Sequence, residues 1–186
     1  KILMIGNSFS DDASQYVPNI LKDLGYTDFE VGNMFIGGCS IDTHYANALN
    51  NYEKYDFRYY TNNAWDNTYG RKKQSLEYAI KFKDWDVITF QQASHDSGRA
   101  STYMNLSFLA QYVKNRATNS NVRFIFHMTW AYQGNSTHSG FARYNNNQMT
   151  MYNAIVNAVQ TSTDGMAVIP SGTAVQNART SFVGDN

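Results

Sequence analysis

Short runs of apolar residues alternate along this chain with longer segments whose apolar residues recur at helical spacing. The short runs have the length of buried strands and lie at residues 2–5, 29–34, 87–90, 122–128 and 166–169. Strands that alternate with helices form parallel sheets whose two faces are covered by those helices. We therefore predict a three-layer α/β/α sandwich around a roughly five-stranded parallel sheet.

The segments between the predicted strands carry helix signals. Ser14 is expected to cap a first helix, with Pro18 in its first turn and Gly25 at its end. Ser40 is expected to cap a second helix, with Leu49 on its inward face. Further helices are predicted at residues 76–82, 102–117 and 141–159 and from residue 171.

Residues 52–71 match neither pattern, because they are rich in Tyr and Asn. A surface hairpin or a long functional loop is predicted there rather than a sixth core strand. The chain shows no repeat and no linker, and 186 residues suit one domain. Residues 1–186 are therefore predicted to form a single domain.

The charge balance excludes some partners. The chain has 15 basic and 15 acidic residues, so its net charge is zero, and its charged fraction of 16% lies below the roughly 25% of typical domains. Nucleic acids and anionic membranes attract clustered Lys and Arg, so neither is an expected partner. No apolar run is long enough to span a bilayer. Cys39 is the only cysteine and the four histidines are scattered, so we expect no metal and no other cofactor.

In open parallel sheets, ligands bind at the carboxyl ends of the strands. The first predicted strand ends in Gly-Asn-Ser, where a tight turn would present the Ser8 hydroxyl beside free backbone N–H groups. Taken alone, such a serine could also be part of a polar turn.

Two further strand ends carry groups that can stabilise negative charge. The second strand leads into Gly-Gly-Cys-Ser, where Gly38 could offer its N–H to an oxyanion or could serve only as a tight turn. The third strand leads into residues 91–96, with Gln91, Gln92 and His95. A carboxamide can donate to an oxyanion without acting as a competing base.

Together these strand ends resemble the SGNH (GDSL-like) hydrolase superfamily of esterases and lipases, which implies a flavodoxin-like fold. Gly-Gly-Cys-Ser followed by His (37–44), Gln-Gln-x-Ser (91–94), Thr-Trp-Ala-Tyr (129–132) and Pro-Ser-Gly-Thr-Ala (170–174) are similar to a Bacteroidetes-type branch that resembles carbohydrate acetylesterases. The resemblance implies that Ser8 is the nucleophile and Gly38 an oxyanion donor. We place the third donor at Gln92, with Gln91 and His95 as alternatives.

The general base of that superfamily is a histidine in an Asp-x-x-His sequence near the C-terminus. This chain contains no Asp-x-x-His. We therefore expect the base to lie beyond Asn186, and the 186 residues alone to be inactive or severely impaired. His127, at the end of the fourth predicted strand, is an alternative base or a buried core histidine.

Trp130 follows the same strand and could stack on a sugar ring or pack in the core. We predict a serine esterase that removes acetyl or other small acyl groups from small-molecule or oligosaccharide esters, with Trp130 and His95 binding the substrate. The alternative is a non-catalytic carbohydrate-binding or scaffold protein on the same fold. The resemblance implies an exported protein, located in the periplasm, on the cell surface or outside the cell.

Overall fold

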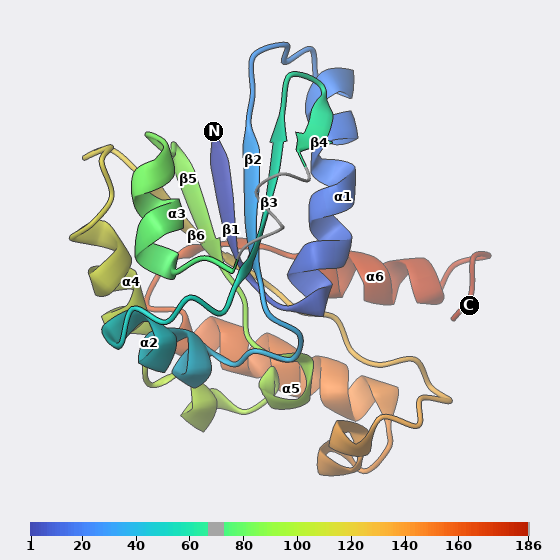
Figure 1. The fold of residues 1–186 in the computed structure, drawn as a ribbon. Helices are drawn as coiled ribbons and strands as arrows, with labels where there is room; N and C mark the ends of the chain where they lie inside the picture. The colour runs from blue at the N-terminus through green and yellow to red at the C-terminus, as the bar shows by residue number, and fades with distance from the viewer. Residues whose placement is uncertain (67–72, 186) are drawn as a thin grey trace.

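A computed structural model describes residues 1–66 and 73–185, and its centre is one sheet (Figure 1). The described strands follow the order β4-β3-β2-β1-β5-β6-β7. Five of them are parallel and lie where strands were predicted: β1 (Ile2–Gly6), β2 (Val31–Phe35), β5 (Val87–Phe90), β6 (Arg123–His127) and β7 (Ala167–Ile169). The predicted α/β fold with a parallel sheet is confirmed.

The remaining strands, β3 (Asp56–Thr61) and β4 (Ala64–Asp66), form a hairpin that extends the sheet. β3 pairs antiparallel with β2, and its Phe57 side chain is fully buried. The predicted hairpin is therefore present, but it belongs to the sheet because its apolar side chains enter the core. Residues 67–71 of that predicted segment lie outside the described residues.

Helices cover the two faces of the sheet unequally. The larger core joins Leu3 and Ile5 of β1 to α2 (Ile41–Leu49), α3 (Leu76–Phe82), α4 (Leu106–Lys114) and α5 (Gln148–Ser162). Met4 points to the opposite face, where it packs in a smaller core beneath α1 (Ser8–Asp23). The last helix, α6 (Ser171–Arg179), follows β7 and contacts α5 (Figure 1). No helix in the two described ranges has the length and apolar character to cross a membrane.

Several helix boundaries differ from the prediction. α1 begins at Ser8 rather than near Ser14, because Asn7 Oδ1 accepts a hydrogen bond from the Phe9 N–H at 3.2 Å and caps it there. Pro18 consequently lies inside α1, where its missing N–H removes one helical hydrogen bond.

The other helix predictions have mixed outcomes. Ser40 caps α2 as predicted, accepting from the Thr43 N–H at 3.2 Å. Leu49 is 61% exposed, because α2 turns His44 and Ala48 inward instead. Two predicted helices begin with short 3₁₀ turns, η3 (Ala100–Tyr103) before α4 and η4 (Ser139–Tyr144) before α5.

Candidate active site

The turn after β1 presents Ser8 at the carboxyl edge of the sheet. Gly6, at the end of β1, lies so close to α1 that an added Cβ would be 2.4 Å from the Ser10 Cβ. A side chain at position 6 would therefore clash with α1. Ser8 is exposed and is the first residue of α1. Its backbone N–H therefore has no acceptor within the helix. A hydroxyl and a free N–H thus meet at the positive end of the helix dipole.

Asn7 holds three strand ends together. Its side chain is 1% exposed, and its Nδ2 donates to the carbonyl oxygens of Cys39 at 3.3 Å and Gln92 at 3.1 Å. These carbonyls belong to the segments that follow β2 and β5. The candidate residues Ser8, Gly38 and Gln92 therefore lie around one buried amide.

The loop after β2 presents Gly38. Its φ is +64°, a conformation that favours glycine, and nothing lies within 4 Å of an added Cβ. The residue is exposed and comes three positions before the start of α2. The Gly38 N–H is thus accessible to an incoming oxyanion.

Cys39, beside Gly38, is a buried residue that is 3% exposed. Burial raises the pKa of its thiol to about 12. The thiol lies 3.5 Å from His44 Nδ1, and burial lowers the pKa of His44 to about 3. Both groups are therefore neutral near pH 7, and they fix the loop beneath Gly38.

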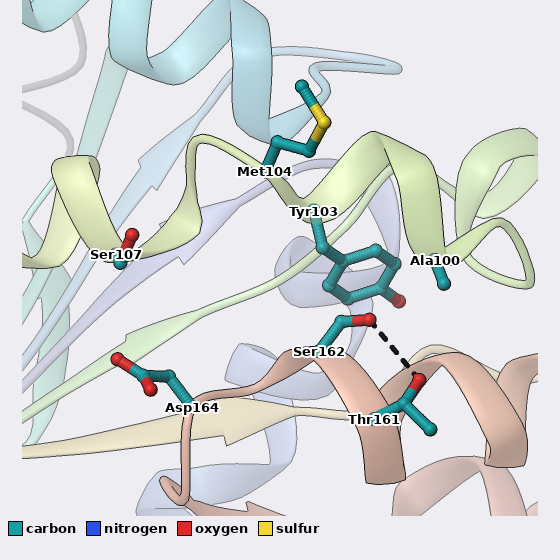
Figure 2. Close-up of a pocket in the computed structure, with 7 residues that line it drawn as sticks. All are labelled: Ala100, Tyr103, Met104, Ser107, Thr161, Ser162 and Asp164. Carbon is teal, nitrogen blue, oxygen red and sulfur yellow. Dashed lines mark hydrogen bonds between the residues drawn. The ribbon is translucent and has the colours of Figure 1, made fainter.

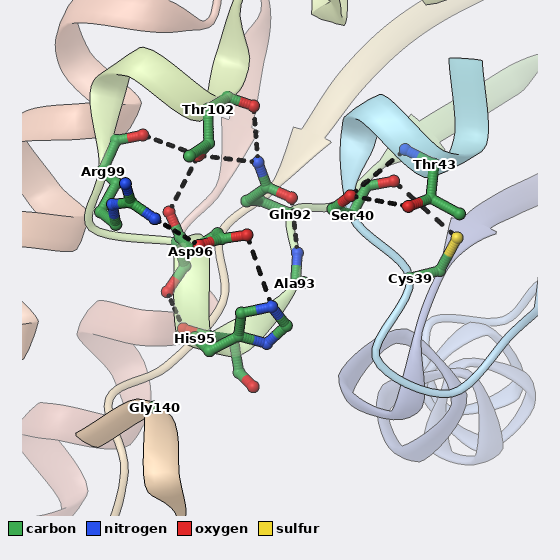
Figure 3. A network of polar contacts seen from close by, with 12 residues as sticks. Cys39, Ser40, Thr43, Gln92, Ala93, His95, Asp96, Arg99, Thr102 and Gly140 are labelled. Atoms are coloured by element: carbon green, nitrogen blue, oxygen red, sulfur yellow. Dashed lines mark hydrogen bonds and ion pairs between the residues drawn. The ribbon is translucent and has the colours of Figure 1, made fainter. Parts of the chain in front are cut away.

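Gln92 does not fit the oxyanion role that we expected of it. Its Nε2 donates to the carbonyl oxygen and the hydroxyl of Thr102, at 2.8 and 3.0 Å (Figure 3). Its Oε1 accepts from the Ile41 N–H at 3.0 Å and the Ala93 N–H at 2.8 Å. Both N–H hydrogens are occupied, so the amide of Gln92 braces the segment after β5 against α2 and η3.

His95, one of the alternatives, keeps a partly open ring. Its side chain is 30% exposed, and its Nε2 lies 3.4 Å from Asp96 Oδ2 (Figure 3). Asp96 is held in turn by Arg99 at 3.0 Å and Arg143 at 2.6 Å. His95 and Gln91 were the two alternatives to Gln92. Of these, only the His95 side chain is accessible, because Gln91 is 1% exposed.

Trp130 joins the same edge of the sheet. Its ring lies 4.5 Å from the ring of Phe9, the residue after Ser8, measured between centroids. The preceding residue, Thr129, donates its hydroxyl to the Gln92 carbonyl oxygen at 3.0 Å. The structure therefore packs Trp130 against Phe9, the neighbour of Ser8 in the sequence, and leaves Trp130 partly exposed.

Within residues 1–66 and 73–185, the Ser8 hydroxyl has no hydrogen-bond partner. His127 does not serve it, because His127 Nε2 lies 3.0 Å from Ser171 Oγ and Nδ1 lies 3.0 Å from Gln91 Nε2. The same described residues contain no group of three side chains suited to a metal ion.

A surface hollow of about 320 Å³ lies elsewhere, between η3 and α4 on one side and the end of α5 on the other (Figure 2). Tyr103, Ser162 and Asp164 are among its lining residues. None of the candidate site residues lines it, so it is separate from the edge that carries Ser8.

Three residues that organise this edge were not identified from the sequence. Asn7 and Thr129 bind backbone carbonyls there, and Ser171 contacts His127. Asn7 stands in the Gly-Asn-Ser turn, so its capping role could have been inferred. The partners of Thr129 and Ser171 are far away in sequence and gave no local signal.

Comparison with known proteins gives the following matches. The family model described as "Domain of unknown function (DUF4886)" matches residues 1–186. The crystal structure of a DUF4886 family protein from Bacteroides uniformis is 41% identical with a TM-score of 0.92, over 99% of this chain and 71% of that chain. No curated protein matches the chain.

More distant structures share the fold. One, titled as a candidate SGNH hydrolase from Slackia heliotrinireducens, is 18% identical with a TM-score of 0.51, over 95% of this chain and 81% of that chain. Another, titled TesA, is 14% identical with a TM-score of 0.50, over 91% of this chain and 77% of that chain. The chain therefore has an SGNH hydrolase-like fold.

Proposed function

The chain belongs to the DUF4886 family, and we propose that it is a serine esterase of the SGNH hydrolase type that removes acetyl or other small acyl groups from carbohydrate esters. The observation that carries this proposal is the position of Ser8. Its hydroxyl is exposed at the start of α1, and Asn7 joins that turn to the Gly38 loop.

The proposed reaction is acyl transfer to Ser8 followed by hydrolysis. The Ser8 oxygen attacks the ester carbonyl, and the negative charge that develops on the carbonyl oxygen is stabilised by the N–H groups of Ser8 and Gly38. We assign no third donor, because the Gln92 amide donates to Thr102 and His95 Nε2 lies 3.4 Å from Asp96 Oδ2. The positive end of α1 adds to this stabilisation.

A serine hydroxyl needs a base to become an effective nucleophile. None of the described histidines lies within hydrogen-bond reach of Ser8, and the sequence has no Asp-x-x-His. We propose that the base is a histidine of such a segment outside residues 1–186. The 186 residues alone should then hydrolyse esters at Ser8 only very slowly.

The preference for carbohydrate is proposed from Trp130 and from the surface charge. A partly exposed indole at the same edge of the sheet as Ser8 can stack on the apolar face of a sugar ring. The chain has no net charge and few charged residues, which suits a neutral substrate. Export of the protein, which the resemblance implies, is consistent with polysaccharide as the substrate source.

The test is acetate release from an acetylated xylo-oligosaccharide by the natural full-length protein. Ser8→Ala should reduce kcat/KM by about 100-fold or more. Ser120→Ala, which removes an exposed hydroxyl between α4 and β6, should leave the rate unchanged. Equal rates for the wild type and Ser8→Ala would overturn the proposal.

A carbohydrate-binding protein is the second candidate, and the lack of a base near Ser8 in the described residues favours it. Under that alternative no acyl ester is hydrolysed in a Ser8-dependent way, yet calorimetry detects binding of the oligosaccharide. Trp130→Ala should then weaken the binding while Ser8→Ala does not.

A further inference from the structure

Three polar side chains form a continuous chain across the ends of adjacent strands. Gln91 follows β5, His127 ends β6, and Ser171 follows β7. Gln91 Nε2 lies 3.0 Å from His127 Nδ1, and His127 Nε2 lies 3.0 Å from Ser171 Oγ. The Gln91 and His127 side chains are 1% and 2% exposed. The proposed reaction at Ser8 uses none of these groups.

Ser171 occupies the same local position as Ser8. Each is the first residue of a helix that follows a parallel strand of the sheet, α6 after β7 and α1 after β1. The first hydrogen bond of α6 runs from the Ala174 N–H to the Pro170 carbonyl at 3.0 Å. The N–H groups of Ser171, Gly172 and Thr173 therefore lack acceptors within the helix and can face an anion.

Gly172 fixes this turn against the rest of the site. A Cβ at Gly172 would lie 2.5 Å from the Thr129 carbonyl oxygen, so the absence of a side chain allows α6 to sit against the segment after β6. Trp130 is in that segment, and its ring lies 6.5 Å from the ring of His127. Ser171 as a residue is half-buried.

The arrangement has the parts of an activated nucleophile: a hydroxyl, a base within hydrogen-bond reach and a third group that orients the base. An amide can present either its nitrogen or its oxygen to Nδ1, by rotation about its last bond. When the Gln91 oxygen faces His127 Nδ1, that nitrogen carries the proton of the neutral ring. The lone pair of His127 Nε2 then faces the Ser171 hydroxyl. Burial lowers the pKa of His127 to about 4, so the ring is neutral near pH 7 and one of its nitrogens keeps a lone pair.

We propose that Ser171 is a second nucleophile for acyl esters, with His127 as its general base and Gln91 as the residue that positions the ring. In the first step the Ser171 oxygen bonds to the ester carbonyl carbon while its proton passes to His127 Nε2. The ester C–O bond then breaks, and the leaving alkoxide takes that proton and departs as an alcohol. Water hydrolyses the acyl-serine, which restores the hydroxyl and releases a carboxylic acid.

The test is covalent labelling of the 186-residue chain with a fluorophosphonate, followed by mass spectrometry of its peptides. The reagent forms an Oγ–P bond with the serine and releases fluoride, and the serine proton leaves through the base. Ser8→Ala is used as the parent, so that the outcome does not depend on the proposed role of Ser8. We expect stoichiometric label on the peptide that contains Ser171. The exposed Ser181, at the other end of α6, should carry none.

Variants separate an activated serine from one that is merely accessible. His127→Gln should slow labelling of Ser171 by about 100-fold or more, while Ser181→Ala leaves it unchanged. Gln91→Glu offers only acceptor oxygens to Nδ1, so labelling should be at least as fast as in the parent. Circular dichroism and thermal unfolding establish that each variant is folded.

The pH profile is a second measurement that needs no variant of the buried residues. With His127 as the base, the labelling rate should be nearly constant from pH 5.5 to pH 8, because the ring is already neutral at the lower end. An unassisted serine would instead react about tenfold faster per pH unit. Absence of label at Ser171, an unassisted pH profile, or unchanged labelling in folded His127→Gln would each overturn the proposal.

Discussion

Replacing Asn7 with alanine tests the claim that one buried side chain assembles the candidate site. The substitution removes the cap of α1, which is worth about 1 kcal/mol. It also leaves the Cys39 carbonyl oxygen without its buried donor, at a cost of about 1–3 kcal/mol. The Gln92 carbonyl oxygen keeps its hydrogen bond from Thr129, so the loss of its bond from Asn7 adds less to the destabilisation. We expect the free energy of unfolding to fall by about 2–4 kcal/mol.

Urea unfolding followed by circular dichroism measures this loss. The matched control is Asn153→Ala, which removes an exposed side chain from the middle of α5. It should change the free energy of unfolding by no more than about 0.5 kcal/mol. A loss below about 1 kcal/mol for Asn7→Ala would refute the reasoning, because the cap alone accounts for that much.

Three further predictions concern the loop after β2, the buried histidines and the aromatic side chain. Gly38→Ala places a side chain at φ +64°. It should lower the free energy of urea unfolding by about 1–2 kcal/mol and reduce Ser8-dependent acetate release about 10-fold or more. Unchanged values would contradict the roles of Gly38 in the turn and in oxyanion binding. Burial lowers the pKa of His44 to about 3 and of His127 to about 4, whereas both titrate near about 6.5 when unfolded. Between those values only the unfolded chain takes up these protons. The free energy of unfolding should therefore fall as the pH drops, by about 1.4 kcal/mol per pH unit for each histidine. Equal free energies of urea unfolding at pH 7 and pH 5 would contradict this. Trp130→Ala should raise KM for an acetylated oligosaccharide by up to about tenfold with little effect on a small acetyl ester, and equal effects on both substrates would argue against sugar stacking.

The parallel strands could be predicted closely because their apolar residues form short runs between segments with helical spacing. The structure places all five within two residues of the expected bounds. The hairpin was harder to place, since β3 alternates polar and apolar side chains. Whether Phe57 enters the core depends on its pairing with β2, which is a long-range contact.

Within the site, strand ends could be predicted but hydrogen-bond partners could not. Ser8, Gly38 and Trp130 lie at the edge where the topology of a parallel sheet requires them. Gln92 was expected to donate to an oxyanion, and the structure gives its amide to Thr102 instead. That partner lies in η3, which follows the strand after a turn, and no spacing in the sequence indicates which way the amide points.

The measurement that tests the central claim most directly is trapping of the acyl-enzyme. The natural full-length protein is mixed with p-nitrophenyl acetate, quenched in acid within milliseconds and digested, and the acetylated peptide is identified by mass spectrometry. The proposed function predicts an acetyl group on the peptide that contains Ser8. This acetylated peptide should be missing in Ser8→Ala. An acetyl group found only on the Ser171 peptide, or no acetyl-serine under conditions in which the ester is turned over, would contradict the claim that Ser8 is the esterase nucleophile.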